Sequence, residues 1–249
     1  MRNGAFDAAM EALQAVLANS PKAPLALAYK TILHNLLIEP AEASTISDLN
    51  HDISIQQLPI PPAFSNEIDF NKALVETLKT NSTLRDDPLV KSTRGGRQSG
   101  ELSMERHPAV VGFLDSLKQA LDDFLAGLKA RPSHPHFIAI PKRYRLVCWS
   151  TILDAEGYQL PHIHPDGWLS GVYYVAVPPE LSDNDPAYKG WIEFGASGYG
   201  LPAHDGPVRL VLPQEGYMVL FPSYFLHRTV PFQSATQRIS IAFDLIPTD

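Results

Sequence analysis

From Phe137 to the C-terminus the sequence breaks into short runs rich in β-branched and aromatic residues, separated by Pro, Gly, Asp and Asn. The runs are Phe137–Ile140, Arg145–Leu153, Leu169–Val177, Trp191–Phe194, Val208–Leu212, Met218–Phe221 and Arg238–Ile246. Closely spaced short strands are typical of an all-β barrel or a two-sheet jelly roll. The pattern therefore predicts such a fold for this half of the chain, with any helices packed on its outside.

The N-terminal residues predict helices instead of strands. Residues 4–37 predict two short amphipathic helices, because apolar residues recur at helical spacing in an alanine-rich background. The pattern resembles one tetratricopeptide repeat, although a plain helical hairpin fits equally well. One repeat cannot bury its own face, so we expect it to dock on the main domain or on another subunit, as in a homodimer. The turn-rich segment Glu39–Asn50 predicts a boundary between a helical unit, residues 1–45, and a main domain, residues 50–249.

Between these regions the pattern changes several times. Residues 53–58 alternate as a strand does and end at a proline-rich stretch. Apolar spacing predicts helices over residues 66–78 and 107–128. Residues 91–99 contain no apolar side chain and two adjacent glycines, which predicts a loop, either a plain surface connection or one that contacts substrate.

Three histidines follow a spacing that suits a metal site. His162 and His164 are two residues apart, and in an extended segment such residues point to the same side. After 62 intervening residues comes His227. Three protein ligands on one face of a non-haem iron(II) ion leave the opposite face open for a cosubstrate and dioxygen. The sequence thus predicts His162, His164 and His227 as metal ligands.

After ten further intervening residues, His227 is followed by the strand pattern Arg238-Ile-Ser240. Alternation places Arg238 and Ser240 on one face of that strand. An arginine that points into a barrel is costly unless it is paired, and its planar fork suits a carboxylate. A bound dicarboxylate would supply the pair, with a further hydrogen bond from Ser240. An ion pair between Arg238 and Asp244, which share this face, is the purely structural alternative.

The order of these motifs resembles the iron(II)/2-oxoglutarate-dependent oxygenases. The segment Gly157–His164 is similar to the Pro-His-x-Asp segment of the prolyl 4-hydroxylase branch. A closer resemblance is to a bacterial and phage branch of 2-oxoglutarate oxygenases with a His-x-His-Pro motif. It is carried by the segments His162–Pro165, Ser170–Tyr174, Phe221–Ser223 and Gly95–Gln98.

The resemblance implies a mainly β fold with α: a double-stranded β-helix (jelly roll, cupin-like) with flanking N-terminal helices. It implies Fe(II) as cofactor, held by His162 and His227, and 2-oxoglutarate as cosubstrate, anchored by Arg238 with help from Ser240. The chain departs from the family where an acid usually provides the middle ligand. Either His164 takes that place in a three-histidine site, which Pro161 before His162 favours, or the motif shifts by two and Asp166 follows His164 as the acid.

The function expected from this resemblance is that of a dioxygenase, an oxidoreductase that hydroxylates a C–H bond of a small molecule or a peptide. A cupin-like three-histidine metalloenzyme that does not use 2-oxoglutarate and a non-catalytic binding module are the alternatives. The other histidines fit surface or hydrogen-bonded positions: His34, His51, His107, His134, His136 and His204.

Composition limits the binding partners and the cellular location that we expect for the protein. The net charge of −7 argues against unspecific nucleic-acid binding. No apolar run approaches membrane-spanning length, and the N-terminus does not resemble a signal peptide. A single cysteine, Cys148, excludes an internal disulfide. These features predict a cytoplasmic protein without a membrane partner.

Overall fold

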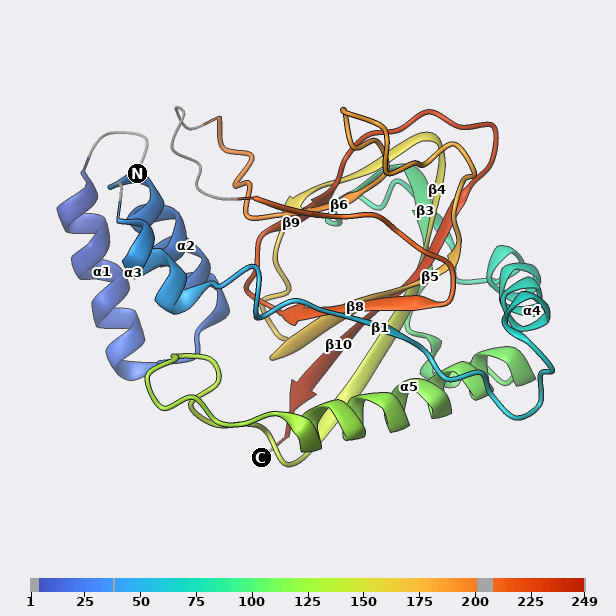
Figure 1. Cartoon of the computed structure of the whole chain (residues 1–249), viewed down its shortest axis with the longest axis horizontal. Helices are drawn as coiled ribbons and strands as arrows, with labels where there is room; N and C mark the ends of the chain where they lie inside the picture. Colours follow the sequence, from blue (N-terminus) through green and yellow to red (C-terminus); the bar gives the residue numbers. More distant parts are fainter. Residues whose placement is uncertain (1–4, 38, 201–207, 249) are drawn as a thin grey trace.

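The computed structural model describes residues 5–37, 39–200 and 208–248 (Figure 1). Its strands form one antiparallel sheet of ten strands that curls into a barrel-like jelly roll. The strands are β1 (Ser54–Gln57), β2 (Arg85–Asp86), β3 (Thr93–Gln98), β4 (Tyr144–His162), β5 (Leu169–Ala176), β6 (Ile192–Phe194), β7 (Arg209–Val211), β8 (Tyr217–Pro222), β9 (His227–Thr229) and β10 (Arg238–Pro247). The predicted double-stranded β-helix is therefore confirmed.

Neighbouring strands follow the order β1-β8-β5-β10-β4-β9-β6-β7, and β3 pairs with both β4 and β2. Figure 1 shows β6 and β9 on one side of the barrel and β1, β8 and β10 on the other. Strand β4 connects the two sides. It pairs with β10 over residues 144–153, with β3 over 151–159, and with β9 at Gln159 and His162.

Two helices cover the outer face of the sheet. Helix α4 (Glu67–Lys79) begins at the capping residue Asn66, whose side chain accepts a hydrogen bond from the Asp69 backbone N–H. Helix α5 (Pro108–Gly127) lies beneath the barrel in Figure 1. Their apolar faces share one buried cluster with alternate side chains of β10. Those side chains are Ile239, Ile241, Phe243 and Leu245. The other side chains of β10, which alternate with these four, therefore face the barrel interior.

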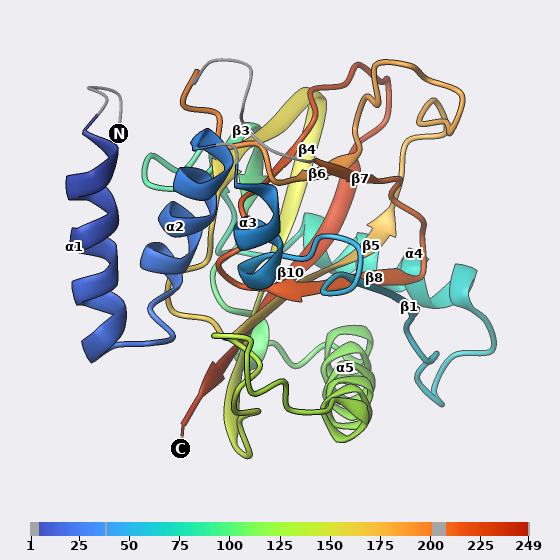
Figure 2. The ribbon, with the colours of Figure 1, turned by 60° about the vertical axis from the view of Figure 1, so that its left-hand side comes forward.

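The N-terminal helices lie side by side at one side of the barrel (Figure 2). They are α1 (Phe6–Asn19), α2 (Pro24–Leu36) and α3 (Pro40–Ile46). Leu27 and Ala28 of α2 and Ile46 of α3 join a second buried cluster that contains Tyr174 and Phe194 of the barrel. These helices thus share a core with the sheet. The division into a helical unit and a main domain stays a prediction.

Sequence patterns misplaced or missed several short segments, among them the two-residue strand β2. Residues 91–99, predicted as a loop, contain β3, and the turn-rich 39–50 contains α3. Phe137–Ile140, predicted as a strand, forms turns, and β9 was not predicted as a strand. A one-turn 3₁₀ helix, η1, covers Leu102–Met104.

The glycines explain why β3 lacks a strand signature. Gly95 has a φ of +62° at a shift in register against β4. At Gly96 an added Cβ would lie 2.5 Å from the Ile152 carbonyl oxygen, so the two strands approach closely only because 96 has no side chain.

Among the described residues, none of the helices is long and apolar enough to cross a membrane.

Candidate active site

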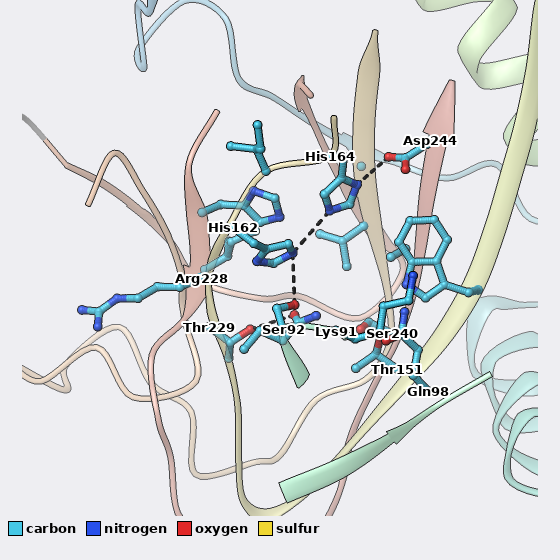
Figure 3. A pocket seen from close by; sticks show the side chains of 18 of the residues that line it. Lys91, Ser92, Gln98, Thr151, His162, His164, Arg228, Thr229, Ser240 and Asp244 are labelled. Carbon is cyan, nitrogen blue, oxygen red and sulfur yellow. Dashed lines mark hydrogen bonds and ion pairs between the residues drawn. The ribbon is translucent and has the colours of Figure 1, made fainter. Parts of the chain in front are cut away.

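The three predicted histidines meet inside the barrel. His162 is the last residue of β4 and pairs in register with His227, the first residue of β9. His164 lies two residues beyond the end of β4, where its backbone N–H donates to the Ser223 carbonyl oxygen. One ligand atom from each histidine lies within 4.8 Å of the other two. The Nε2 atoms of His162 and His164 are 3.4 Å apart (Figure 3).

The hydrogen bonds of the three rings fix which nitrogen carries the proton. Nδ1 of His162 lies 2.8 Å from the Leu160 carbonyl oxygen, and Nδ1 of His227 lies 2.9 Å from that of Phe225. Nδ1 of His164 lies 2.5 Å from Oδ1 of Asp244. Because these partners accept hydrogen bonds, each Nδ1 carries the proton and each Nε2 keeps its lone pair. Three lone pairs directed at one space form a ligand set that fits a cation.

Electrostatics keeps His162 and His227 in the form that binds metals. Burial, and then the nearby His164, lowers the pKa of His162 to about 4. Burial, and then the other two imidazoles, lowers the pKa of His227 well below its ordinary value. Both rings are therefore neutral at neutral pH, and a neutral imidazole is the state that coordinates a metal.

Arg238 occupies the same cavity and has an unusual environment. The side chain is 1% exposed, and its guanidinium lies over the ring of Tyr174, 4.9 Å from the ring centroid. Its Nε and Nη1 atoms have no hydrogen-bond partner among the described residues. A buried guanidinium with free donors is costly, so this position fits an anion.

The structural alternative for Arg238 does not occur. Asp244 bonds to His164 and to the Ser170 hydroxyl and forms no ion pair with Arg238 within the described part of the chain. Six residues separate Arg238 from Asp244 on β10, which is roughly 20 Å along a strand. The two charged side chains therefore serve different ends of the cavity.

Two further polar residues face this cavity and were not predicted as site residues. Thr151 of β4 and Gln98 of β3 lie near Ser240 (Figure 3). Thr151 Oγ1 and Gln98 Oε1 are buried and lack a hydrogen-bond partner in the described residues. Thr151 pairs in register with Ser240 across β4 and β10. The alternation of β4 could have identified Thr151, whereas Gln98 was hidden because residues 91–99 had no strand pattern.

The cavity that joins these groups has a volume of about 360 Å³. It is lined by the three histidines, Arg238, Ser240, Thr151 and Gln98, together with apolar side chains such as Trp149 and Phe221. Ser92 also lines it, with its hydroxyl 3.3 Å from His162 Nε2. One cavity thus contains both a possible cation site and a possible anion site.

Asp166, the alternative middle ligand, lines the cavity but is exposed and does not belong to the three-residue cluster found within the described residues. The cluster therefore contains His164 and not Asp166.

The remaining histidines lie elsewhere. His134 and His136 are buried loop residues, and His136 stacks on Trp168 with the ring centroids 4.7 Å apart. His34, His51 and His107 make local hydrogen bonds to Glu39, Asp48 and Thr77. His204 lies outside the described residues.

Comparisons with known proteins cover the part of the chain that contains this cavity. Residues 147–244, which run from β4 to Asp244, match the family described as putative 2OG-Fe(II) oxygenase. No curated protein sequence matches the chain.

Solved structures share the fold. A prolyl hydroxylase from Trichoplax adhaerens, in complex with a hypoxia inducible factor peptide fragment, superposes with a TM-score of 0.55 at 17% identity and covers 85% of this chain and 92% of its own. A Pseudomonas putida prolyl-4-hydroxylase gives a TM-score of 0.51 at 17% identity, with coverage of 80% and 94%. HygX from Streptomyces hygroscopicus, with nickel and 2-oxoglutarate bound, gives 0.50 at 13%, with coverage of 79% and 83%. The chain thus resembles the 2OG-Fe(II) oxygenases over residues 147–244, and it shares its fold with these solved structures.

Proposed function

We propose that this oxidoreductase is an iron(II)- and 2-oxoglutarate-dependent dioxygenase that hydroxylates a C–H bond of a small molecule or a peptide. The observation that carries the proposal is one cavity in which ligand atoms of three imidazoles lie within 4.8 Å of one another and a buried guanidinium has free donors. Neither feature alone requires this chemistry. A metal and a dicarboxylate together would satisfy both.

The residues of the chain have separate roles in this proposal. His162, His164 and His227 would hold Fe(II) through Nε2, with each Nδ1 proton committed to an acceptor in the protein. When bound, iron(II) and 2-oxoglutarate would supply the electrons that activate dioxygen, which the protein side chains cannot supply. The chain itself contributes the placement of the reactants and the exclusion of water.

The anion end of the cosubstrate would lie at the other end of the cavity. Arg238 would hold the distal carboxylate, because its guanidinium has donors free and cannot lose its proton there. Ser240 and Thr151 would add neutral hydrogen bonds from adjacent strands, and Gln98 could donate through its amide nitrogen. Arg238 is 1% exposed, so its guanidinium has lost almost all contact with water. A bound carboxylate would replace the hydrogen bonds that this water would have made.

Succinate release tests the proposal. Purified protein is incubated with Fe(II), ascorbate and 2-oxoglutarate under air, and succinate is measured by mass spectrometry. We expect metal-dependent succinate formation that His227→Ala and Arg238→Ala both abolish. The surface variant His51→Ala should retain it. Succinate formation that persists unchanged in Arg238→Ala would refute the assignment of the anion site.

A three-histidine metalloenzyme that does not use 2-oxoglutarate is the second candidate, since no carboxylate belongs to the cluster of ligands in the described residues. It predicts metal binding without affinity for 2-oxoglutarate. It also leaves the free donors of Arg238 unexplained. Titration of the metal-loaded protein with 2-oxoglutarate distinguishes the two candidates, and a binding module without catalysis would show a melting temperature that neither ligand raises.

A further inference from the structure

Asp244 makes the contact that distinguishes His164 from the other two histidines. His162 and His227 donate from Nδ1 to neutral backbone carbonyls, whereas His164 donates to the Asp244 carboxylate at 2.5 Å. His164 also occupies the position at which the motif resemblance leads one to expect an acid. A carboxylate is therefore present near the site, but the imidazole of His164 lies between it and the proposed cation.

The surroundings hold this carboxylate in place. Asp244 is 9% exposed, and the same Oδ1 atom accepts a hydrogen bond from the Ser170 hydroxyl at 2.6 Å. Ser170 in turn lies 2.8 Å from the Ser223 hydroxyl. At Gly167 an added Cβ would lie 2.4 Å from Ser223 Oγ, so the loop after His164 closes directly over this group. The carboxylate has little freedom to turn away from His164.

The backbone around His164 is fixed without Asp244. The His164 N–H donates to the Ser223 carbonyl at 2.9 Å, and the Trp168 N–H donates to the Leu245 carbonyl at 2.9 Å. The Asp244 carboxylate is therefore not needed to hold the loop. What it adds is the orientation of one ring and a negative charge.

That charge balances the loaded site. Fe(II) carries two positive charges and 2-oxoglutarate two negative ones, and an imidazole that coordinates a metal is a neutral ligand. Arg238 would leave one positive charge in excess inside a largely buried cavity, and Asp244 removes it. Of the other charged side chains that line the cavity, Arg228 is neutralised by a two-point ion pair with Glu193, and the exposed Lys91 and Asp166 carry opposite charges. A hydrogen bond to a carboxylate also makes an imidazole a more basic ligand.

Resting on the function proposed above, we infer that Asp244 is a positioning residue that supplies, through His164, the negative charge which a three-histidine site lacks. The carboxylate polarises the Nδ1–H bond of His164 and strengthens its Nε2 as a ligand. It does not belong to the cluster of ligand atoms found in the described residues. It acts on the proposed cation only through the imidazole.

The test compares Asp244→Asn with Asp166→Asn. Each variant replaces a carboxylate that lines the cavity by a neutral amide of nearly the same volume, but Asp166 is exposed and outside the histidine cluster. Cobalt(II) is titrated into each protein under argon, and its visible bands report affinity and ligand geometry. We expect Asp244→Asn to bind cobalt about 10- to 100-fold more weakly than wild type and Asp166→Asn to match wild type.

The midpoint potential of the bound iron provides a readout that a purely structural role would not move. Loss of a nearby negative charge destabilises Fe(III) more than Fe(II), so the potential should be higher in Asp244→Asn. Cobalt affinity in Asp244→Asn within threefold of wild type, or an equal loss in Asp166→Asn, would overturn the inference. If wild type itself binds neither cobalt nor 2-oxoglutarate, the proposed function fails instead.

Ser170→Ala distinguishes an effect of the Asp244 charge from an effect of packing around it. It also provides a second test if Asp244→Asn does not fold. This variant keeps the carboxylate and removes a hydroxyl that competes with His164 for the same oxygen. We expect cobalt affinity to be retained. A tenfold loss in Ser170→Ala would show that the network acts by packing and would overturn the charge role of Asp244.

Discussion

Replacing Arg238 by methionine should change stability and cosubstrate binding in opposite directions. The guanidinium is 1% exposed, and two of its nitrogens have no protein partner in the described residues. Each unsatisfied buried group costs about 1–3 kcal/mol, and exchange of buried charges for apolar side chains of similar volume often stabilises a protein by about 1–4 kcal/mol. We therefore expect Arg238→Met to make the ligand-free protein more stable by about 1–4 kcal/mol.

The same substitution should weaken binding of 2-oxoglutarate. Truncation of one partner of a buried, hydrogen-bonded charge pair costs about 2–5 kcal/mol, which corresponds to roughly 30- to 4,000-fold in affinity. Calorimetric melting of the ligand-free protein measures the first effect, at about 2–4 °C per kcal/mol for a chain of this size. Isothermal titration of the manganese-loaded protein with 2-oxoglutarate measures the second.

Arg228→Met is the matched control. Arg228 lines the same cavity, but it is partly exposed and makes a two-point ion pair with Glu193, with N–O distances of 3.0 and 2.9 Å. Its removal should lower stability and leave 2-oxoglutarate affinity near wild type. The reasoning is refuted if ligand-free Arg238→Met melts below wild type while its affinity for 2-oxoglutarate is unchanged, because Arg238 would then have a purely structural role.

Three further substitutions test other parts of the site and the fold. His227→Ala removes one of three Nε2 ligands, so cobalt(II) titration should show no binding at concentrations that saturate wild type. Thr151→Val removes a buried hydroxyl that has no protein partner among the described residues; we expect about 1 kcal/mol, or roughly fivefold, weaker 2-oxoglutarate binding in calorimetry and no loss of stability in urea. Gly96→Ala places a Cβ 2.5 Å from the Ile152 carbonyl oxygen, so urea unfolding should show a loss of about 1–3 kcal/mol, and a wild-type midpoint would disprove the close approach of β3 and β4.

The sequence was most informative where one physical period dominates. Alternation along β10 separated Arg238 and Ser240 from the apolar side chains that face α4 and α5, and the structure places those sets on opposite faces. The spacing of His162 and His164 indicated a shared direction, and their Nε2 atoms lie 3.4 Å apart. Both predictions need only local geometry.

Features set by distant contacts were not predictable in this way. Strand β3 contains two glycines and no apolar residue, and it is a strand because β4 pairs with it. Asp244 was expected to matter only as a partner for Arg238. Its actual partner, His164, is 80 residues away in the sequence, and no local pattern indicates a pairing over that distance. Gln98 was missed for the same reason as β3.

Two strands each contribute to both ends of the cavity. Strand β4 carries Thr151 and His162, and β10 carries Arg238 and, through Asp244, the support for His164. The separation between the cation and the carboxylate anchor is therefore set by paired backbone, which cannot lengthen or shorten as a loop can. Such a frame should discriminate oxo-diacids by their number of carbons. Oxaloacetate is one methylene shorter than 2-oxoglutarate, and 2-oxoadipate is one methylene longer. Each should reach either the proposed cation or Arg238, but not both at once.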